Sequence, residues 1–347
     1  MMLTRSFLGS SALLGAGLLL VGGSATAAEV KPGGALDITI EGYVRFLAGV
    51  GDLKEKRDAQ TGAYDFRNDT ELHVLVKGED EGTGIEYGAT IELEADTSET
   101  DNAGATWIFL KGGFGELRFG DDDGLAKDFA LGGFSVAVGT GGTDGEIIDT
   151  EAVNYLTASD SDATKVKYYS PTLAGFQLGV GYTPHVEGEG DAIDLTDDGG
   201  VDDYVEAGIS YEAELGEIEV LAAIAGGLGH VNTGGDDEVR GLYGGVQIEL
   251  FDVQLAGGWG TEEIGGDDRT WLNVGVAYEL DDAISVSLTY GDCYDCDDGE
   301  PYNLVAGVEV GLLPGVALSG ELSWFDEDRG GDDDDGVLGV VQLSVAF

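Results

Sequence analysis

The sequence predicts an all-β, transmembrane fold, namely an antiparallel up-and-down barrel of sixteen strands with a long third loop folded into its lumen. Three observations predict it. Segments with two-residue alternation recur along nearly the whole chain, and the connections between them are short and long in turn. Aromatic residues also gather at both ends of the alternating segments. Together these features are typical of a protein that crosses a bilayer with strands.

The alternation puts apolar and polar side chains on opposite faces of each segment. In "LDITIEGYVRF", Leu36, Ile38 and Ile40 share one face, and Asp37 and Glu41 lie on the other. The segments "IEYGATIELEA", "VEAGISYE" and "ISVSLTYG" repeat the scheme, which indicates strands between two different environments. Sixteen such segments begin near positions 36, 66, 84, 105, 115, 164, 175, 203, 217, 240, 252, 270, 283, 302, 315 and 337.

The connections between these segments fall into two classes. Those that follow even-numbered segments are short, such as "GEDEGTG", "SPTLAG" and "LLPG". Those that follow odd-numbered segments are long and acidic, such as "VGDLKEKRDAQTGAYD", "GTEEIGGDDR", "GDCYDCDDGEPYN" and "FDEDRGGDDDDG". A meander with short turns at one end and long loops at the other is the layout of a membrane barrel.

Aromatic residues with the parity of the apolar face predict two girdles, one at each rim. If odd segments run up and even segments run down, the upper girdle holds Tyr182, Trp259, Tyr290 and Trp324, and the lower girdle holds Tyr168, Tyr211, Tyr278 and Phe347. A soluble sandwich or propeller also alternates, but it gains nothing from two girdles, whereas a bilayer favours them. We expect Phe347 to end the closing strand, because an unpaired edge in lipid costs several kcal/mol per backbone group.

Residues 1–27 have the pattern of a secretory signal peptide. One basic residue, Arg5, precedes an apolar run and the small-residue site "ATA" at 25–27. The alternative, a transmembrane anchor, is weaker because the run is short and interrupted by glycine. We therefore expect a barrel domain of residues 28–347 that leaves the cytoplasm.

The composition limits the partners and the class of the protein. There are 68 acidic residues against 16 basic ones, for a net charge of −52. This excludes nucleic acid as a partner, since phosphate binding needs clustered Lys and Arg. Such an acidic chain could be disordered, but a hydrophobic content of 42% favours a packed fold.

The order of several segments carries a family resemblance. "ITIEGYVRFLAGV", "FRNDTELHVLVKGEDEGTGIEYGATIELEA", "WIFLKGGFGELRFGD", "YYSPTLAGFQLGVGY" and the terminal Phe347 together resemble the general, non-specific porins of alphaproteobacteria, such as the trimeric sixteen-stranded porins of purple photosynthetic bacteria. The resemblance implies a water-filled channel for passive diffusion of small hydrophilic solutes and ions. It also implies a homotrimer in the outer membrane of a Gram-negative bacterium, in contact with its lipid and lipopolysaccharide.

The third long connection, residues about 121–162, is expected to enter the barrel and constrict it. It has an apolar middle, "FALGGFSVAVG", and many acids against one base, Lys127. Inside the barrel this apolar stretch can pack on the wall, and sixteen strands leave a channel wide enough to hold it. The alternative is a mobile external loop.

Charges on the two sides of the lumen predict a constriction with a transverse field. The basic side consists of Arg45, His73, Arg118, Lys165 and Lys167. The acidic loop contributes Asp121, Asp122, Asp123, Asp128, Asp144, Glu146, Asp149 and Glu151. The alternative is that these are ordinary charges on a wetted wall. The acid excess predicts that the channel prefers cations.

The remaining candidates concern cysteines, metals and enzymes. Cys293 and Cys296 are expected to form a disulfide in an external loop, although zinc binding and redox chemistry are alternatives that lack further ligands and context. The acidic clusters at 121–123 and 332–335 are candidate Ca²⁺ or Mg²⁺ sites; the alternative is that they are simply solvated charges. No other cofactor is expected.

We expect no enzyme activity. The rivals are a structural or plugged barrel and, with less support, an outer-membrane hydrolase using His185 or His230.

Overall fold

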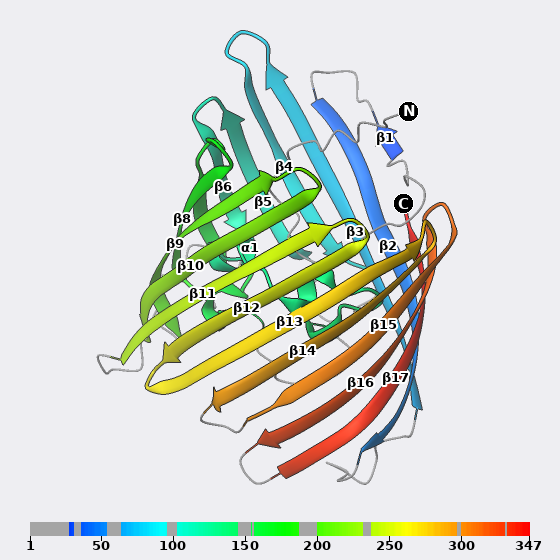
Figure 1. Cartoon of the computed structure of the whole chain (residues 1–347). Coiled ribbons are helices and arrows are strands. Elements are labelled where there is room, and N and C mark those ends of the chain that lie inside the picture. Colours follow the sequence, from blue (N-terminus) through cyan, green and yellow to red (C-terminus); the bar gives the residue numbers. More distant parts are fainter. Residues whose placement is uncertain are drawn as a thin grey trace.

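The computed structural model describes residues 28–30, 36–53, 64–95, 103–144, 154, 156–186, 200–231, 237–296, 300–329 and 332–347. The predicted signal peptide, residues 1–27, lies outside these ranges. Most of the described residues belong to one antiparallel sheet that closes on itself (Figure 1). No helix in the described ranges is long and apolar enough to cross a membrane.

Sixteen long strands make up the wall of the barrel. They are β2 (Leu36–Leu53), β3 (Tyr64–Asp80), β4 (Ile85–Glu94), β5 (Ala103–Gly112), β6 (Gly115–Asp121), β7 (Thr164–Tyr169), β8 (Phe176–His185), β9 (Val201–Glu214), β10 (Ile218–Val231), β11 (Asp237–Leu250), β12 (Val253–Ile264), β13 (Asp267–Asp281), β14 (Ile284–Cys296), β15 (Tyr302–Leu313), β16 (Val316–Arg329) and β17 (Asp332–Ala346). Each pairs with its neighbour in sequence, which confirms the predicted up-and-down order.

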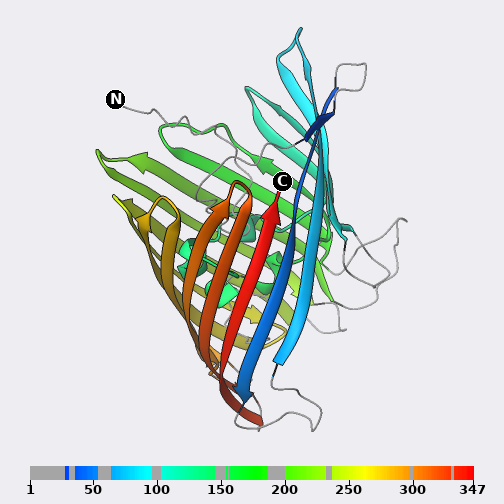
Figure 2. The same ribbon diagram turned by 90° about the vertical axis from the view of Figure 1, so that its right-hand side faces the viewer.

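The ring closes where β17 pairs with β2. Their register runs from Gly336 opposite Leu53 to Ala346 opposite Tyr43, and Figure 2 shows the two strands side by side. One residue further on, Phe347 and Gly42 exchange two backbone hydrogen bonds of 3.0 Å. The terminal Phe347 therefore ends the closing strand, as the alternation predicts, and the paired backbone at this seam presents no open edge to lipid.

A short strand that the sequence does not predict precedes the barrel wall. β1 (Ala28–Val30) pairs with β2 from Ala28 opposite Ile40 to Val30 opposite Ile38. Because β17 ends opposite Tyr43 and Phe347 pairs with Gly42, this part of β2 lies beyond the end of its other neighbour, and β1 covers the edge. Three residues are too few to produce a recognisable alternation.

The alternation places apolar side chains on the outside of the barrel. Along β8, Leu178, Val180 and Tyr182 are 55%, 50% and 41% exposed, whereas Gly181 and Thr183 between and beyond them are buried. Lumen-facing positions of the later strands hold buried polar residues instead, among them Glu206, Gln254, Asn273, Ser287 and Gln342. An apolar outside and a polar inside are what a barrel surrounded by lipid requires.

Several of the acidic connections predicted as long loops are strand ends instead. In "GTEEIGGDDR", β12 continues to Ile264 and β13 starts at Asp267, so the turn contains only Gly265 and Gly266. Both glycines have positive φ, 62° and 98°, which two-residue hairpin turns need. Likewise, Arg329 pairs with Asp332 at the end of the β16–β17 hairpin. Composition alone suggests loops there, but the backbone of these acidic segments is paired in the ladder.

Candidate functional site: the lumen and its inserted loop

The third long connection folds into the barrel, as the sequence predicts. It leaves β6 at Asp121 and returns at Thr164, and it contains the helical turns α1 (Leu125–Asp128), η1 (Gly133–Val136), η2 (Gly142–Asp144) and η3 (Thr157–Ser159). α1 contacts β8, β9 and β10, η1 contacts β12 to β14, and η2 contacts β14 and β15. The described part of the loop therefore follows the inside of the wall (Figures 1 and 2).

Apolar side chains of the loop pack on wall positions that have no side chain. Leu125 lies over Gly179, Phe129 over Gly208 and Leu156 over Gly241, each so close that a Cβ there would meet the loop at 2.5–2.7 Å. Leu125, Phe129 and Leu156 are at most 5% exposed. This cluster is a hydrophobic core inside the barrel, and it holds the loop against the wall.

The backbone of the loop also touches the wall directly. The carbonyl oxygen of Leu131 lies 1.8 Å from the place where a Cβ on Gly245 would be, and 2.5 Å from the equivalent place on Gly258. The same oxygen accepts a hydrogen bond of 2.8 Å from the Tyr243 hydroxyl. Conversely, a Cβ on Gly133 of the loop would lie 2.3 Å from the carbonyl oxygen of Val274 on β13. Glycine at these wall positions is required by close approach rather than by backbone angle.

Three buried carboxylates on the wall accept backbone N–H groups of the loop. Glu206 on β9 accepts from Leu125 and Ala126, both at 3.0 Å. Glu262 on β12 accepts from Thr157 at 3.1 Å and Ala158 at 3.4 Å. Glu321 on β16 accepts from Thr140 at 3.0 Å and Gly142 at 3.2 Å. We call Glu206, Glu262 and Glu321 the wall carboxylates. They satisfy N–H groups that the loop's short helical turns leave without partners.

Wall amides and hydroxyls extend this pattern between the carboxylates. Gly133 donates its N–H to Asn273 at 2.9 Å, and Val138 donates to the Ser287 hydroxyl at 3.0 Å. Asn273 in turn donates to the carbonyl of Asn154 at 3.3 Å. The loop is thus held by polar side chains from β9 to β16, which fixes its backbone in place.

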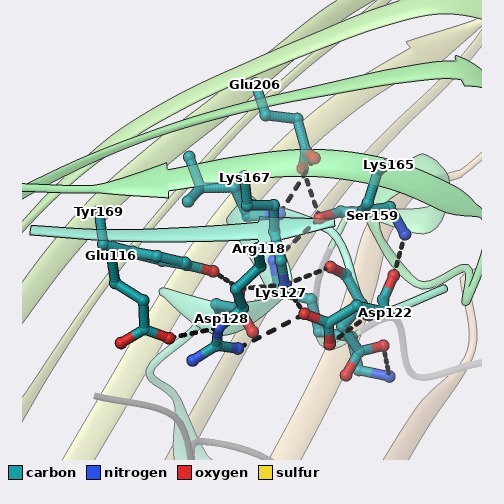
Figure 3. Close-up of polar contacts among 12 residues, drawn as sticks. Glu116, Arg118, Asp122, Lys127, Asp128, Ser159, Lys165, Lys167, Tyr169 and Glu206 are labelled. Carbon is teal, nitrogen blue, oxygen red and sulfur yellow. Dashed lines mark hydrogen bonds and ion pairs between the residues drawn. The ribbon is translucent and has the colours of Figure 1, made fainter. Parts of the chain in front are cut away.

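A cluster of buried charges ties the start of the loop to β6 and β7 (Figure 3). Lys167 contacts Asp122 and Asp128, both at 2.7 Å, and Arg118 contacts Glu116 at 2.7 Å and Asp122 at 3.4 Å. Lys167 is fully buried and Arg118 is 5% exposed. Burial is the strongest influence on the pKa of the Asp122 carboxyl and raises it, whereas the positive charges of Lys167 and Arg118 lower that pKa. We call these five residues the root cluster.

The two ends of the loop are also joined to each other. Lys127 contacts Asp123 at 2.9 Å and Asp160, and its N–H donates to the Ser159 hydroxyl at 2.9 Å. Gly124 donates its N–H to the carbonyl of Ser159 at 2.7 Å. The outgoing and returning segments therefore form one connected base beside β6 and β7.

A second set of charges lies on β2 and β3. Arg45 contacts Asp69 at 2.9 Å and lies over the Tyr43 ring, with its guanidinium carbon 3.7 Å from the ring centroid. His73 contacts Glu71 at 2.5 Å, and Tyr43 donates its hydroxyl to the same carboxylate. β3 and β11 are eight strands apart in a ring of sixteen, so this arc faces the wall on which Leu131 packs.

The predicted basic side divides between these two places. Arg118 and Lys167 contact loop acids in the root cluster, and Lys165 donates to the backbone carbonyls of Asp122 and Ser161. Arg45 and His73 instead contact wall acids of β3. The structure thus brings three of the five predicted bases against the loop. The other two lie on β2 and β3 and contact acids of the wall.

Four of the eight predicted acidic residues lie at the root of the loop. Asp122, Asp123 and Asp128 contact basic residues there, and Asp121 accepts from the Thr164 hydroxyl. Glu146, Asp149 and Glu151 lie outside the described residues, as does the side chain of Asp144. Their part in a constriction stays a prediction.

Sequence reasoning missed the residues that hold the loop. Each wall carboxylate is a lumen-facing acid with at least one small neighbour on the same face: Gly208 beside Glu206, Gly260 beside Glu262, and Ser319 and Ser323 beside Glu321. A lone acid beside a small residue on an inward face leaves room for another backbone, and this pattern could have indicated them. Glu116, Asp69 and Glu71 carry no comparable pattern.

The two cysteines lie at the end of a strand rather than in a loop. Cys293 and Cys296 belong to β14, with Cα atoms 6.0 Å apart, a separation that a disulfide can span. Cys293 is fully buried and packs in the same inner cluster as Trp271. The predicted loop is therefore wrong at these positions, because β14 continues paired with β13 as far as Cys296, while the external side of the membrane stays a prediction.

The predicted girdle residues differ in exposure. Tyr182, Trp259, Tyr278, Trp324 and Phe347 are 39–45% exposed. Tyr168, Tyr211 and Tyr290 are partly buried; Tyr211 packs against the Phe176 ring, with centroids 4.4 Å apart. The contacts of these rings with a membrane interface stay a prediction.

Comparison with known proteins identifies relatives of this fold. Residues 11–330 match the model of a family described as Gram-negative porin. An anion-selective porin from Comamonas acidovorans is 19% identical, with a TM-score of 0.63 over 90% of this chain and 100% of that one. The outer membrane channel DcaP of Acinetobacter baumannii is 15% identical, with a TM-score of 0.66 over 92% and 100%.

A third similar structure is the in-vitro folded outer membrane protein OmpT of Vibrio cholerae in its trimer form. It is 13% identical, with a TM-score of 0.61 over 89% of this chain and 99% of that one. No curated protein sequence matches the chain. At these identities the structures show a shared fold, and the family match carries the assignment. Since that match spans most of the chain, the protein belongs to the Gram-negative porin family and forms an outer-membrane channel for solute diffusion.

Proposed function

We propose that the channel prefers cations among the small hydrophilic solutes that diffuse through it. The observation that carries this proposal is the pairing of its inward basic residues. Arg45, Arg118 and Lys167 each contact at least one carboxylate, so their charge is compensated locally, whereas the chain as a whole has a net charge of −52. A lumen with an acid excess attracts cations and repels anions.

Reversal potentials test this proposal. The purified protein is inserted into a planar bilayer that separates two KCl concentrations, and the sign of the zero-current potential gives the preferred ion. We expect potassium to permeate faster than chloride. A potential of the opposite sign would reject cation preference while leaving the channel itself intact, and a protein that conducts no current would favour the plugged or structural barrel.

We also propose that the functional unit is a homotrimer embedded in outer-membrane lipid and lipopolysaccharide. The exposed apolar band supports contact with lipid or with a second copy, with Phe46, Leu255 and Val341 each at least 50% exposed. The trimer form of the similar Vibrio cholerae protein supports the stoichiometry. The mass of the detergent-solubilised protein, determined by light scattering with the detergent contribution subtracted, distinguishes one copy from three. That the chain belongs with the general porins of alphaproteobacteria is likewise a proposal.

We also propose the predicted disulfide and the predicted Ca²⁺ or Mg²⁺ sites, and each has a test of its own. Counting thiols with and without reductant tests Cys293 and Cys296, and two free thiols without reductant would contradict the disulfide. For Ca²⁺ or Mg²⁺ at the acidic segments 121–123 and 332–335, chelation should lower the melting temperature of the assembly. An unchanged melting temperature would count against these cation sites.

A further inference from the structure

Three neighbouring strands place a histidine between carboxylates on the lumen side of the wall. His73 on β3 lies directly opposite Glu41 on β2 and directly opposite Glu92 on β4. Glu71 precedes His73 by two residues and therefore lies on the same face. Side chains directly opposite each other in an antiparallel pair have Cβ atoms about 4.5–5.5 Å apart, so the register alone brings these groups together.

The donor atoms of three of these side chains converge. One ligand atom each from Glu71, His73 and Glu92 lie within 4.8 Å of one another. We propose that these three residues form a binding site for a divalent transition metal ion of the Zn²⁺ class in the channel wall. Glu71 and His73 are 18% and 22% exposed, so the group is partly shielded yet open to ions in the lumen.

The ligand set selects the class of ion. An imidazole nitrogen with carboxylate oxygens suits Zn²⁺ and neighbouring divalent metals, whereas Ca²⁺ and Mg²⁺ prefer oxygen ligands throughout. Three protein ligands also leave a coordination position for water from the lumen. Ligands at about 2.1 Å in tetrahedral geometry have donor atoms about 3.4 Å apart. The Nε2 of His73 and the Oε1 of Glu71, at 2.5 Å, would separate by about 1 Å to admit the ion.

A neighbouring residue already holds one ligand in place. Tyr43 on β2 donates its hydroxyl to Oε2 of Glu71, which leaves Oε1 directed at His73. Hydrogen bonds of this kind orient ligating carboxylates in known metal sites. Glu41, opposite His73, adds negative charge to the same face.

A bound ion would act on conduction because of where the site lies. The carboxylate of Glu92 interacts electrostatically with those of Asp122 and Asp123 at the start of the inserted loop. A divalent ion held there would place two positive charges on the wall beside that loop. We therefore expect Zn²⁺ to reduce potassium conductance. This goes beyond the proposed cation preference, because binding itself does not depend on which ion permeates faster.

Calorimetric titration of the full-length protein in detergent with Zn²⁺ tests the site directly. The variants are His73→Gln and Glu92→Gln, so that two changes on different strands report on the same ligand set. The matched control is His185→Gln, because His185 also contacts a carboxylate, Asp202, at 2.6 Å. Within the described ranges no third His, Cys, Asp or Glu joins that pair at ligand distance. Mg²⁺ is titrated in parallel.

We expect one Zn²⁺ per chain, weakened at least about tenfold by His73→Gln and by Glu92→Gln but unchanged by His185→Gln, together with a Zn²⁺-dependent drop in conductance that follows the same order. Zn²⁺ binding of equal strength in all variants would place the metal on other acids and overturn the proposal. So would Mg²⁺ binding that is as tight as Zn²⁺ binding and is weakened by the same two changes, since it would indicate an oxygen-only site among these residues. If the wild type binds no Zn²⁺, the proposal is likewise overturned. His73 then only pairs with its neighbouring carboxylates.

Discussion

At the scale of single residues, the inner wall is shaped to receive a second stretch of backbone. Glycines at 245 and 258 leave space for the Leu131 carbonyl, and the Tyr243 hydroxyl beside them donates to the same oxygen. The wall carboxylates then accept the N–H groups that the loop presents on either side. Space and hydrogen bonding therefore act together, because a loop without close approach could not reach these acceptors.

Adding one methyl group at Gly245 should displace the loop. In Gly245→Ala the new Cβ would lie 1.8 Å from the Leu131 oxygen, which cannot be accommodated without movement of the backbone. Overpacking of this kind costs about 1–3 kcal/mol. We expect a lower melting temperature and an altered single-channel conductance. Gly244→Ala is the control, because its Cβ would find its nearest neighbour at an ordinary 3.5 Å. Equal behaviour of the two variants would show that the loop does not rest on this glycine.

Replacing one wall carboxylate with its amide should loosen the loop without changing its packing volume. Glu206 accepts from Leu125, Ala126 and the Ser159 hydroxyl, the last at 2.6 Å. In Glu206→Gln one acceptor oxygen becomes an NH₂ donor, so a buried N–H loses its partner at a cost of about 1–3 kcal/mol. We expect earlier proteolytic cleavage within 122–163 in the detergent-solubilised protein.

Glu212→Gln is the matched control for this change. It makes the same substitution on the same face of β9, but at an exposed position near the strand end. If both variants are cleaved at the wild-type rate, the carboxylate at 206 is not an anchor of the loop.

At the scale of elements, the third loop depends on its attachment to β6 and β7. Lys167 is fully buried between Asp122 and Asp128, and removing one partner of a buried ion pair costs about 3–5 kcal/mol. We therefore expect Lys167→Met to lower the melting temperature strongly. Lys77→Met, which breaks the exposed pair with Glu86 at 2.7 Å, should cost only about 0–1 kcal/mol. Differential scanning calorimetry compares them, and similar losses would contradict a structural role for the root cluster.

The same elements show what can be predicted from sequence and what cannot. Alternation fixes which face of a strand is apolar, so the sixteen long strands and the place of Phe347 follow from it. The apolar middle of the loop likewise predicts its packing inside. The partner of Leu125 is Glu206, 81 positions away, and a loop without periodicity gives no register against the wall. Acidic ends such as 260–269 mislead in the other direction, since their composition resembles a loop while their backbone continues the ladder.

At the scale of the whole molecule, the charge and the architecture have to be considered together. An apolar band in lipid forces polar residues to the lumen and to the strand ends, and most of the charged residues in the chain are acidic, 68 against 16 basic ones. Where basic residues occur in the root cluster, they hold the loop rather than line open water, as the burial of Arg118 and Lys167 shows. The field that a permeating ion meets is therefore expected to be set by carboxylates.

A field of this origin predicts that selectivity depends on ionic strength. The screening length falls from about 10 Å at 0.1 M salt to about 3 Å at 1 M, so carboxylates that do not touch the permeating ion lose most of their influence. We expect the potassium-to-chloride permeability ratio, obtained from reversal potentials at a constant tenfold KCl gradient, to fall towards the ratio of the free ions as the mean concentration rises. A ratio that stays constant over this range would mean that contact with a few fixed groups, rather than the acid excess of the whole barrel, determines which ion passes.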